Sequence, residues 1–122
     1  MKITATVVLA VALTLVPSVA NAASWGAIAF SQSTQALGWT HDYRNQSAAE
    51  NSAMSRCEQY ADDCEIAVSF HNACGAIAVG RNGGWGADWG TDDWEAKQSA
   101  IGVCSEHDSG CRVIRWQCSG AQ

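Results

Sequence analysis

The hexapeptide Trp25-Gly-Ala-Ile-Ala-Phe30 returns as Cys74-Gly-Ala-Ile-Ala-Val79, 49 residues further along the chain. Two pairs of cysteines repeat as well, at an offset of 47 residues and with seven positions from one member to the next: Cys57 and Cys64, then Cys104 and Cys111. The chain is therefore a tandem duplication, with one copy in residues 25–70 and the other in residues 74–118.

Each copy shows the same order of structural signals: an apolar strand, a turn, a second strand, a helix and a third strand. The first strands are predicted at residues 27–31 and 76–80, and the second near residues 37–40 and 85–89. Neither copy is long enough to bury a core of its own. We predict an α+β fold in which duplicated strand-strand-helix-strand units form a mostly antiparallel sheet of about six strands, with two helices on one face.

Capping signals mark the start of both predicted helices. Ser47-Ala-Ala-Glu50 fits a capping box in the first copy, and Asp92-Asp-Trp-Glu95 fits one in the second. The inward positions are mostly small, which lets a helix lie close to a sheet; they are Ala49, Ala53, Cys57, Tyr60, Ala96, Ala100, Val103 and Cys104. The third strands show period-two alternation, at Ile66, Val68 and Phe70 and again from Val113 or Ile114 through Trp116 to Cys118.

Residues 1–22 have the three parts of a secretory signal peptide. Lys2 supplies the positive charge, an apolar run extends from Ile3 to Val16, and Ala20-Asn21-Ala22 is a small-x-small cleavage site. A membrane anchor is the alternative, but the run is short for a hydrocarbon layer of about 30 Å, and Pro17 closes it. We predict cleavage before Ala23, a single domain over residues 23–122 and a secreted or periplasmic location, with no membrane span after cleavage.

The chain is acidic, because it has seven Lys or Arg and twelve Asp or Glu. Because neutralising phosphates requires clustered Lys and Arg, this balance argues against nucleic acid as a partner. Solubility explains the acidity more simply than an acidic binding face does.

The six cysteines are an even number in an exported chain, which favours disulfides, with 15 connectivities possible. The equal spacing of the two repeated pairs indicates two local bridges, Cys57 to Cys64 and Cys104 to Cys111. Cys74 and Cys118 are then left to close a longer loop. A structural zinc site is the competing interpretation, but the sequence has no CxxC, and its three His do not sit at ligand spacing from the Cys.

The order of motifs along the chain resembles that of a bacterial secreted family. The motifs are Trp-Gly-Ala-Ile-Ala, an Ala-rich helix ending in Cys, Cys-x-Ile-x-Val, Asn-x-Cys-Gly-Ala-Ile-Ala-Val and a second helix with Cys-x6-Cys. The family is known as domain of unknown function 4189, and the resemblance extends from Trp25 to Cys118. It implies export, one domain per chain and the three bridges above. It implies no activity and no catalytic residue.

Few residues point to catalysis. An adjacent carboxylate can orient an imidazole for general-base chemistry, as Asp42 could for His41, but neighbours on a strand point to opposite faces. His71 and His107 fit surface positions. No free Cys and no Gly-x-Ser-x-Gly elbow is expected. A hydrolase with paired carboxylates stays open, because acidic residues can meet in space without a sequence signature; the candidates are Glu50, Glu58, Asp88 and Glu95.

Residues 82–94 place three Trp and three Asp among glycines. Trp85, Asp88 and Trp89 could form a binding surface, because indole rings stack on sugars and carboxylates bind their hydroxyls. Calcium held by Asp88, Asp92 and Asp93 is an alternative, although the EF-hand pattern is absent. The simplest interpretation is that Trp85 and Trp89 pack on the sheet while Asp92 caps the helix.

The function predicted from sequence is a secreted, non-enzymatic interaction module for a protein or an envelope glycan, with no cofactor and no metal. A carboxylate-dependent hydrolase of envelope or host polymers and a calcium-binding secreted protein are the alternatives. The Cys74 to Cys118 bridge belongs to the second copy alone, because its counterpart position in the first copy is Trp25. This asymmetry makes the second copy the place to look for function.

Overall fold

The structure is a computed structural model that describes residues 4–7, 9–12 and 23–120. Lys2, the cleavage site at residues 20–22 and residues 3, 8 and 13–16 of the predicted apolar run lie outside the described residues. The elements are β1 (Trp25–Ser31), β2 (Leu37–Tyr43), α1 (Gln46–Glu58), β3 (Cys64–His71), β4 (Cys74–Val79), β5 (Trp85–Gly90), α2 (Asp93–Ser105) and β6 (Arg112–Cys118). Among the residues described, no helix combines the length and apolar character that crossing a membrane requires.

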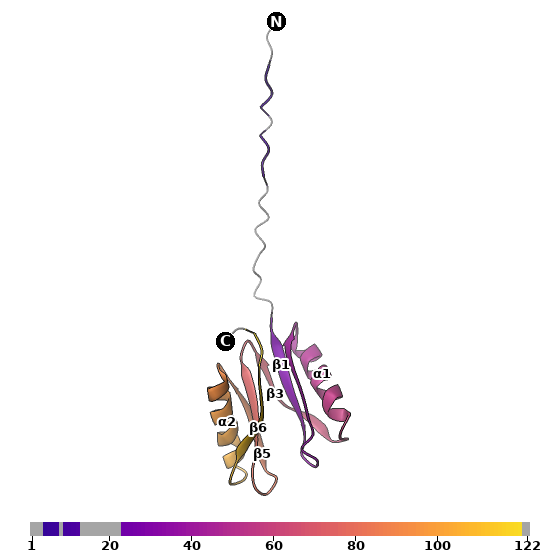
Figure 1. Cartoon of the computed structure of the whole chain (residues 1–122), viewed down its shortest axis with the longest axis vertical. Coiled ribbons are helices and arrows are strands. Elements are labelled where there is room, and N and C mark those ends of the chain that lie inside the picture. The colour runs from indigo at the N-terminus through magenta and orange to yellow at the C-terminus, as the bar shows by residue number, and fades with distance from the viewer. Residues whose placement is uncertain (1–3, 8, 13–22, 121–122) are drawn as a thin grey trace.

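Two antiparallel sheets of three strands face each other, in the orders β2-β1-β3 and β5-β4-β6, with one helix outside each (Figure 1). The α+β class, the repeated strand-strand-helix-strand order and the antiparallel pairing are confirmed. The arrangement differs from the expected sheet of six strands with both helices on one face. Each central strand is buried on both faces, so each sheet needs a helix on one side and the other sheet on the opposite side.

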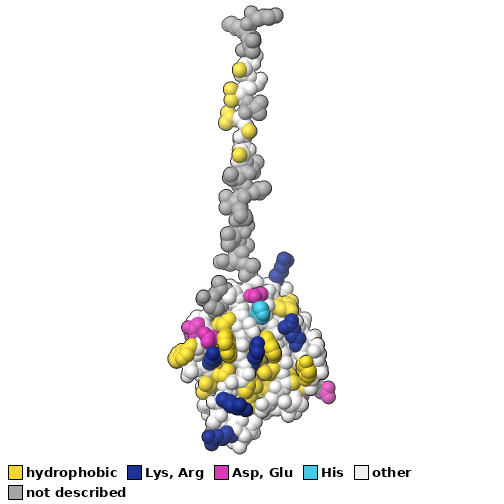
Figure 2. All heavy atoms as spheres, in the orientation of Figure 1, with side chains coloured by type: hydrophobic (Ala, Val, Ile, Leu, Met, Phe, Trp, Pro, Cys, Tyr) yellow, Lys and Arg dark blue, Asp and Glu magenta, His cyan; other side chains and the backbone are white. Residues whose placement is uncertain are grey.

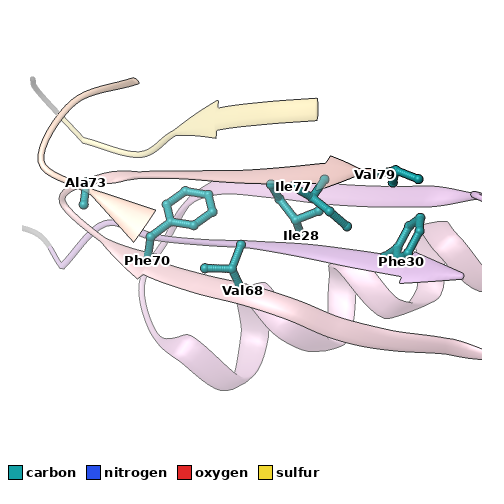
Figure 3. Packing of buried hydrophobic residues seen from close by; sticks show 7 residues of the cluster. All are labelled: Ile28, Phe30, Val68, Phe70, Ala73, Ile77 and Val79. Carbon is teal, nitrogen blue, oxygen red and sulfur yellow. The ribbon is translucent and has the colours of Figure 1, made fainter. Parts of the chain in front are cut away.

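Alternation within the repeated hexapeptide builds these layers. In β1, Ile28 and Phe30 face the other sheet, while Ala27 and Ala29 face α1. The larger side chains fill the layer between the sheets (Figure 3), which consists of Ile28, Phe30, Val68, Phe70, Ala73, Ile77 and Val79. The layers beneath the helices contain alanine and half-cystine: Ala27, Ala29, Ala49, Ala53 and Cys57 under α1, and Cys74, Ala76, Ala78, Ala96, Ala100 and Cys104 under α2. Small residues therefore keep each helix close to its sheet.

The predicted inward helix positions are confirmed except at their ends, since Tyr60 lies beyond α1 and is exposed, and Val103 is half-buried. The cap of α2 is also confirmed, because Asp92 Oδ1 accepts a hydrogen bond from Glu95 N at 2.8 Å. The predicted cap of α1 at Ser47 is wrong. Asn45 has the extended backbone of a cap, and its side chain accepts from Ala48 N at 2.8 Å, so the helix begins at Gln46.

A shift of register in β3 corrects the predicted alternation of Ile66, Val68 and Phe70. Ile28 is opposite Val68 and Ala29 is opposite Ile66, which leaves Ala67 as an extra residue. Ile66 therefore packs on the α1 side, while Val68 and Phe70 face the other sheet. The second copy has the same irregularity between Arg115 and Val113 in β6.

The three disulfides are those predicted. Cys57–Cys64 and Cys104–Cys111 each join the end of a helix to the following strand, with the Cα atoms 6.1 Å apart in both. Cys74–Cys118 joins opposite positions of β4 and β6. The long bridge therefore fixes the C-terminal end of β6 to the central strand of its sheet.

We expect Gly86→Ala and Gly102→Ala to change stability in opposite directions. A Cβ at Gly86 would overlap the α2 backbone at Cys104 N, whereas one at Gly102 would meet nothing within 4 Å. Because the α2 backbone cannot yield, the first change lowers the free energy of unfolding by about 1–3 kcal/mol. The second raises it by about 0.5–1 kcal/mol through helix propensity. Chemical denaturation measures both, and equal effects would contradict the close packing of α2.

Candidate functional site

The two copies differ most where their third strands face the opposite sheet. In β3, Val68 lies opposite Ile28, and Phe70 lies opposite Gly26; both side chains are buried between the sheets. In β6 the equivalent positions carry Arg115, opposite Ile77, and Gln117, opposite Gly75. The second copy therefore places polar side chains where the first places core residues.

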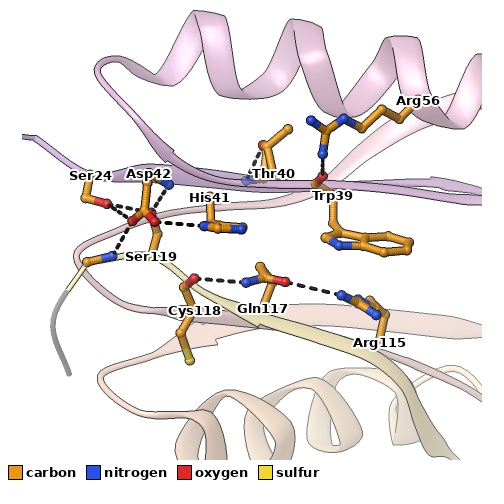
Figure 4. Close-up of polar contacts among 12 residues, drawn as sticks. Ser24, Trp39, Thr40, His41, Asp42, Arg56, Arg115, Gln117, Cys118 and Ser119 are labelled. Carbon is orange, nitrogen blue, oxygen red and sulfur yellow. Dashed lines mark hydrogen bonds and ion pairs between the residues drawn. The ribbon is translucent and has the colours of Figure 1, made fainter.

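Arg115 is packed against the opposite sheet at this position. Its guanidinium carbon lies 3.6 Å from the centre of the Trp39 ring of β2, and its Nη2 donates to Gln117 Oε1 at 3.2 Å (Figure 4). Nε is buried and has no hydrogen-bond partner among the described residues. Burial also lowers the pKa of Arg115 below its ordinary value, since water is excluded from the charged form. Among the described residues, the guanidinium is therefore held by stacking on Trp39 and by one hydrogen bond to a side chain.

Two further basic side chains lie near this stack or behind it, because Arg115 is opposite Ile77 and faces the other sheet, whereas Trp116 is opposite Ala76 and faces α2. Arg56 of α1 donates from Nη1 to the carbonyl oxygen of Trp39 at 2.7 Å. Lys97 of α2 lies 4.1 Å from the centre of the Trp116 ring, and Trp116 is exposed. We call this surface the cation–aromatic face; its members are Trp39, Arg56, Lys97, Arg115 and Trp116.

Two hollows adjoin the cation–aromatic face. One of about 330 Å³ is lined by Ile114, Arg115, Trp116 and Gln117. The other, of about 250 Å³, lies beyond Trp39 and is lined by Leu37, Gly38, Trp39, Arg56, Gln59 and Tyr60. Figure 2 shows Lys and Arg side chains distributed among hydrophobic ones on the side of the molecule where β6 lies in front, with few acidic side chains.

His41 and Asp42 are in contact, contrary to the expectation that they point to opposite faces. Asp42 has φ of 61° and is an extra residue in β2, because Trp25 is opposite Tyr43 and Ala27 is opposite Thr40. This bulge turns the carboxylate so that Oδ2 lies 2.8 Å from His41 Nδ1. The equivalent part of β5 pairs with β4 in regular register, so the bulge belongs to the first copy alone.

Asp42 also joins the two ends of the described fold. Its Oδ1 accepts from Ser24 Oγ at 2.8 Å and from Gly120 N at 3.1 Å, while its own N donates to Ser119 Oγ at 2.8 Å. The hydrogen bond with His41, followed by those with Gly120 and Ser24, lowers the pKa of Asp42 to about 2. We call Ser24, Asp42, Ser119 and Gly120 the terminal clasp.

We expect Asp42→Asn to destabilise the fold at neutral pH and to have little effect in strong acid. The ordinary pKa of this carboxyl is 3.8 and the folded value is about 2. Its ionised form therefore contributes stability that is fully present above about pH 4 and is lost as the pH falls towards 2. Melting temperatures of both chains at about pH 6 and about pH 2.5 measure the difference. Asp108 titrates over the same range in both chains, because its pKa is also about 2. A difference of the same size at both pH values would contradict the role of the ionised clasp.

The His41–Asp42 pair lacks a nucleophile within the part of the chain that the structure describes. The hydroxyls of Ser24 and Ser119 bind each other at 2.7 Å and bind Asp42, not His41. An oriented imidazole without an adjacent hydroxyl or thiol does not make a nucleophilic site.

The acidic candidates have separate partners. Glu50 accepts from Ser69 Oγ at 2.7 Å, and Glu95 accepts from Thr91 Oγ1 at 2.7 Å; their helices lie on opposite outer faces (Figure 1). Of the three suggested calcium ligands, Asp88 accepts from Trp89 N, Asp92 caps α2 and Asp93 pairs with Lys97. Within the described ranges, no three His, Cys, Asp or Glu side chains lie close enough together to hold a metal ion. Glu58 is the last residue of α1, the helix that also carries Glu50.

The Trp-rich hairpin lies on the opposite side of the sandwich, where β3 faces β5. Trp85 packs against the inter-sheet core and meets Phe30 edge to face at 5.4 Å between ring centres. Trp89 is 54% exposed and borders a hollow of about 330 Å³ that also includes Trp25 and His71, which stack at 4.7 Å. A larger hollow of about 550 Å³ lies beside Trp85 and is also lined by His107. A binding role for Trp85, Asp88 and Trp89 stays a prediction.

Sequence reasoning missed Arg115 and Gln117 as candidate site residues. A polar residue in a strand with period-two alternation normally indicates a solvent-facing position. The signal was present in the 47-residue offset, which aligns Arg115 with Val68 and Gln117 with Phe70. Aligning β3 with β6 shows that Val68 and Phe70 are replaced by Arg115 and Gln117 in the second copy.

The fold and this face define a class of small α+β proteins, built from a duplicated strand-strand-helix-strand unit and braced by disulfides. A family model described as "Domain of unknown function (DUF4189)" matches residues 25–118, and the chain belongs to that family. The chain is also similar to the solved NMR structure of the protein Rv1813c from Mycobacterium tuberculosis, with 25% sequence identity and a TM-score of 0.53. That match covers 78% of this chain and 74% of the other. A comparison with curated proteins gave no match.

Proposed function

We propose that the chain is a non-enzymatic binding module that acts outside the cytoplasm, secreted or in the periplasm, and that the cation–aromatic face binds its partner, an envelope glycan or a protein. The observation that carries the proposal is Arg115, a half-buried cation at a position where the other copy has a core valine. A buried polar group costs stability unless it is fully paired, so an incompletely paired guanidinium at this position fits a role in binding better than a role in folding.

The extracytoplasmic location is supported by two independent features. Three disulfides use all six cysteines, which fits an oxidising compartment. The signal peptide predicted over residues 1–22 supplies the route of export. The proposed mature chain begins at Ala23, next to the terminal clasp.

Binding to a cell-envelope fraction tests the proposed function. The expected result is that the chain of residues 23–122 sediments with the envelope, and that Trp116→Gln lowers its apparent affinity by about tenfold or more. Trp89→Gln is the matched control, since it removes an exposed indole from the other side of the sandwich. Melting temperatures of both variants should stay near that of the wild type, because both rings are exposed.

The outcomes separate the two surfaces. Loss of binding in Trp89→Gln alone would assign the activity to the Trp-rich hairpin and contradict a role for the cation–aromatic face. Wild-type affinity in both variants would contradict binding at either surface.

A further inference from the structure

The charges on the cation–aromatic face oppose those of the whole chain. The chain has a formal net charge of −5, yet this face holds Arg56 and Arg115, each against Trp39, and Lys97, which stacks on Trp116 and pairs with Asp93. Figure 2 shows the same contrast, since basic side chains outnumber acidic ones on the side shown. Charge complementarity therefore calls for an anionic occupant.

Arg115 has no acidic partner among the residues that the structure describes, whose ion pairs are His41–Asp42 and Lys97–Asp93. Its guanidinium lies over the Trp39 ring, and one nitrogen donates to Gln117. A planar guanidinium matches a carboxylate, which can accept two parallel hydrogen bonds from it. The hollow of about 330 Å³ beside Arg115 gives such a group access.

The surroundings of Arg115 favour a sugar over a peptide. Trp39 presents its indole to the guanidinium, Trp116 lines the same hollow from the next position of β6, and Gln117 adds a side-chain amide that can bind hydroxyls. A sugar ring offers an apolar face and hydroxyls in the same unit. A bound peptide would need apolar pockets for its side chains, and Ile114 is the one aliphatic residue lining this hollow.

Cations on both sides of Trp39 indicate more than one anion. Arg115 stacks on the ring, and Arg56 binds the backbone carbonyl of the same residue at the border of the second hollow. A polysaccharide with a carboxylate on each ring would offer a second anion to Arg56.

We propose that the cation–aromatic face binds a polysaccharide whose sugar rings carry carboxylates, with Arg115 pairing with a carboxylate and Trp116, which lines the same hollow, contacting the sugar ring. The proposal rests on the proposed function, because it names the ligand of the same face. In this proposal, the carboxylate of one sugar binds Arg115, and the next sugar of the chain lies near Arg56.

Titration of the chain of residues 23–122 with a short oligosaccharide of galacturonic acid, followed by tryptophan fluorescence, tests the proposal. We expect saturable binding that weakens by about tenfold or more in Arg115→Met. Arg44→Met is the matched control, because Arg44 is exposed and its loss changes the net charge equally; its affinity should stay within about threefold of wild type. The carboxyl-reduced oligosaccharide keeps the rings without the charges and should bind at least about tenfold more weakly.

Each other outcome overturns a defined part of the proposal. Equal affinity for the carboxyl-reduced sugar would show that the carboxylate is not recognised. Tighter binding of poly-glutamate would show that the face binds an acidic peptide. If Arg115→Met and Arg44→Met weakened the affinity for the oligosaccharide equally, the effect would come from net charge and not from Arg115 itself. No binding of the oligosaccharide, with envelope binding still dependent on Trp116, would overturn the ligand class and leave the proposed function standing. Envelope binding that is independent of Trp116 would overturn the proposed function itself.

Discussion

Replacing Phe70 with Ala is expected to lower the free energy of unfolding by about 3–5 kcal/mol, a large part of the stability of a domain of this size. The side chain is 2% exposed and lies between the two sheets (Figure 3). A Cβ at either Gly26 or Gly75 would overlap its ring, so one glycine from each central strand makes room for it. Removing the ring leaves a cavity whose walls are two hydrogen-bonded sheets that cannot collapse into it.

Gln117→Ala is the matched control, because Gln117 holds the position equivalent to Phe70 in the second copy. Its amide contacts Arg115 and the carbonyl oxygen of Cys118, and its loss should cost no more than about 1 kcal/mol. Urea denaturation of the two variants measures both values. Equal losses would mean that the β2–β6 side is as much a structural core as the β3–β5 side.

Replacing both Cys74 and Cys118 with Ala is expected to lower the free energy of unfolding by about 4 kcal/mol. The bridge closes a loop with a sequence separation of 44 residues, and in the chain-entropy model a longer loop gives a larger loss of freedom in the unfolded chain. The change also releases β6 from β4 at the end of the strand that carries Arg115 and Gln117. We therefore expect weaker ligand binding even under conditions in which the variant stays folded.

The equivalent double change at Cys57 and Cys64 supplies the control. That bridge spans seven residues, for which the same model gives about 2.4 kcal/mol. The expected order, measured by chemical denaturation under matched conditions, is a clearly greater loss for the long bridge. A smaller loss for the long bridge than for the short one would contradict this order.

The order of elements and the disulfides could be predicted because they depend on local signals and on repetition. The two copies of Gly-Ala-Ile-Ala located the central strands, and the equal cysteine spacing located two bridges. Which layers cover those strands could not be predicted. An apolar strand requires burial on both faces, but its sequence does not say whether a helix or a second sheet provides it.

The candidate site and the terminal clasp were less accessible from sequence, because each depends on a departure from regularity. The bulge at Asp42 joins it to His41, although regular alternation separates neighbours. Arg115 resembles a surface residue in its own strand and is exceptional only when compared with Val68. Neither departure follows from local propensity, because both arise from how the copies pair and face each other.

The free energy of unfolding of Arg115→Met tests the central claim most directly, that Arg115 is kept at a core-equivalent position for binding and not for stability. Methionine keeps an unbranched stem for packing on Trp39 and removes the incompletely paired cation. The expected result, from urea denaturation of the wild type and the variant at neutral pH, lies between no change and a gain of about 2 kcal/mol. A loss of more than about 1 kcal/mol would show that the guanidinium stabilises the fold, and it would contradict the claim.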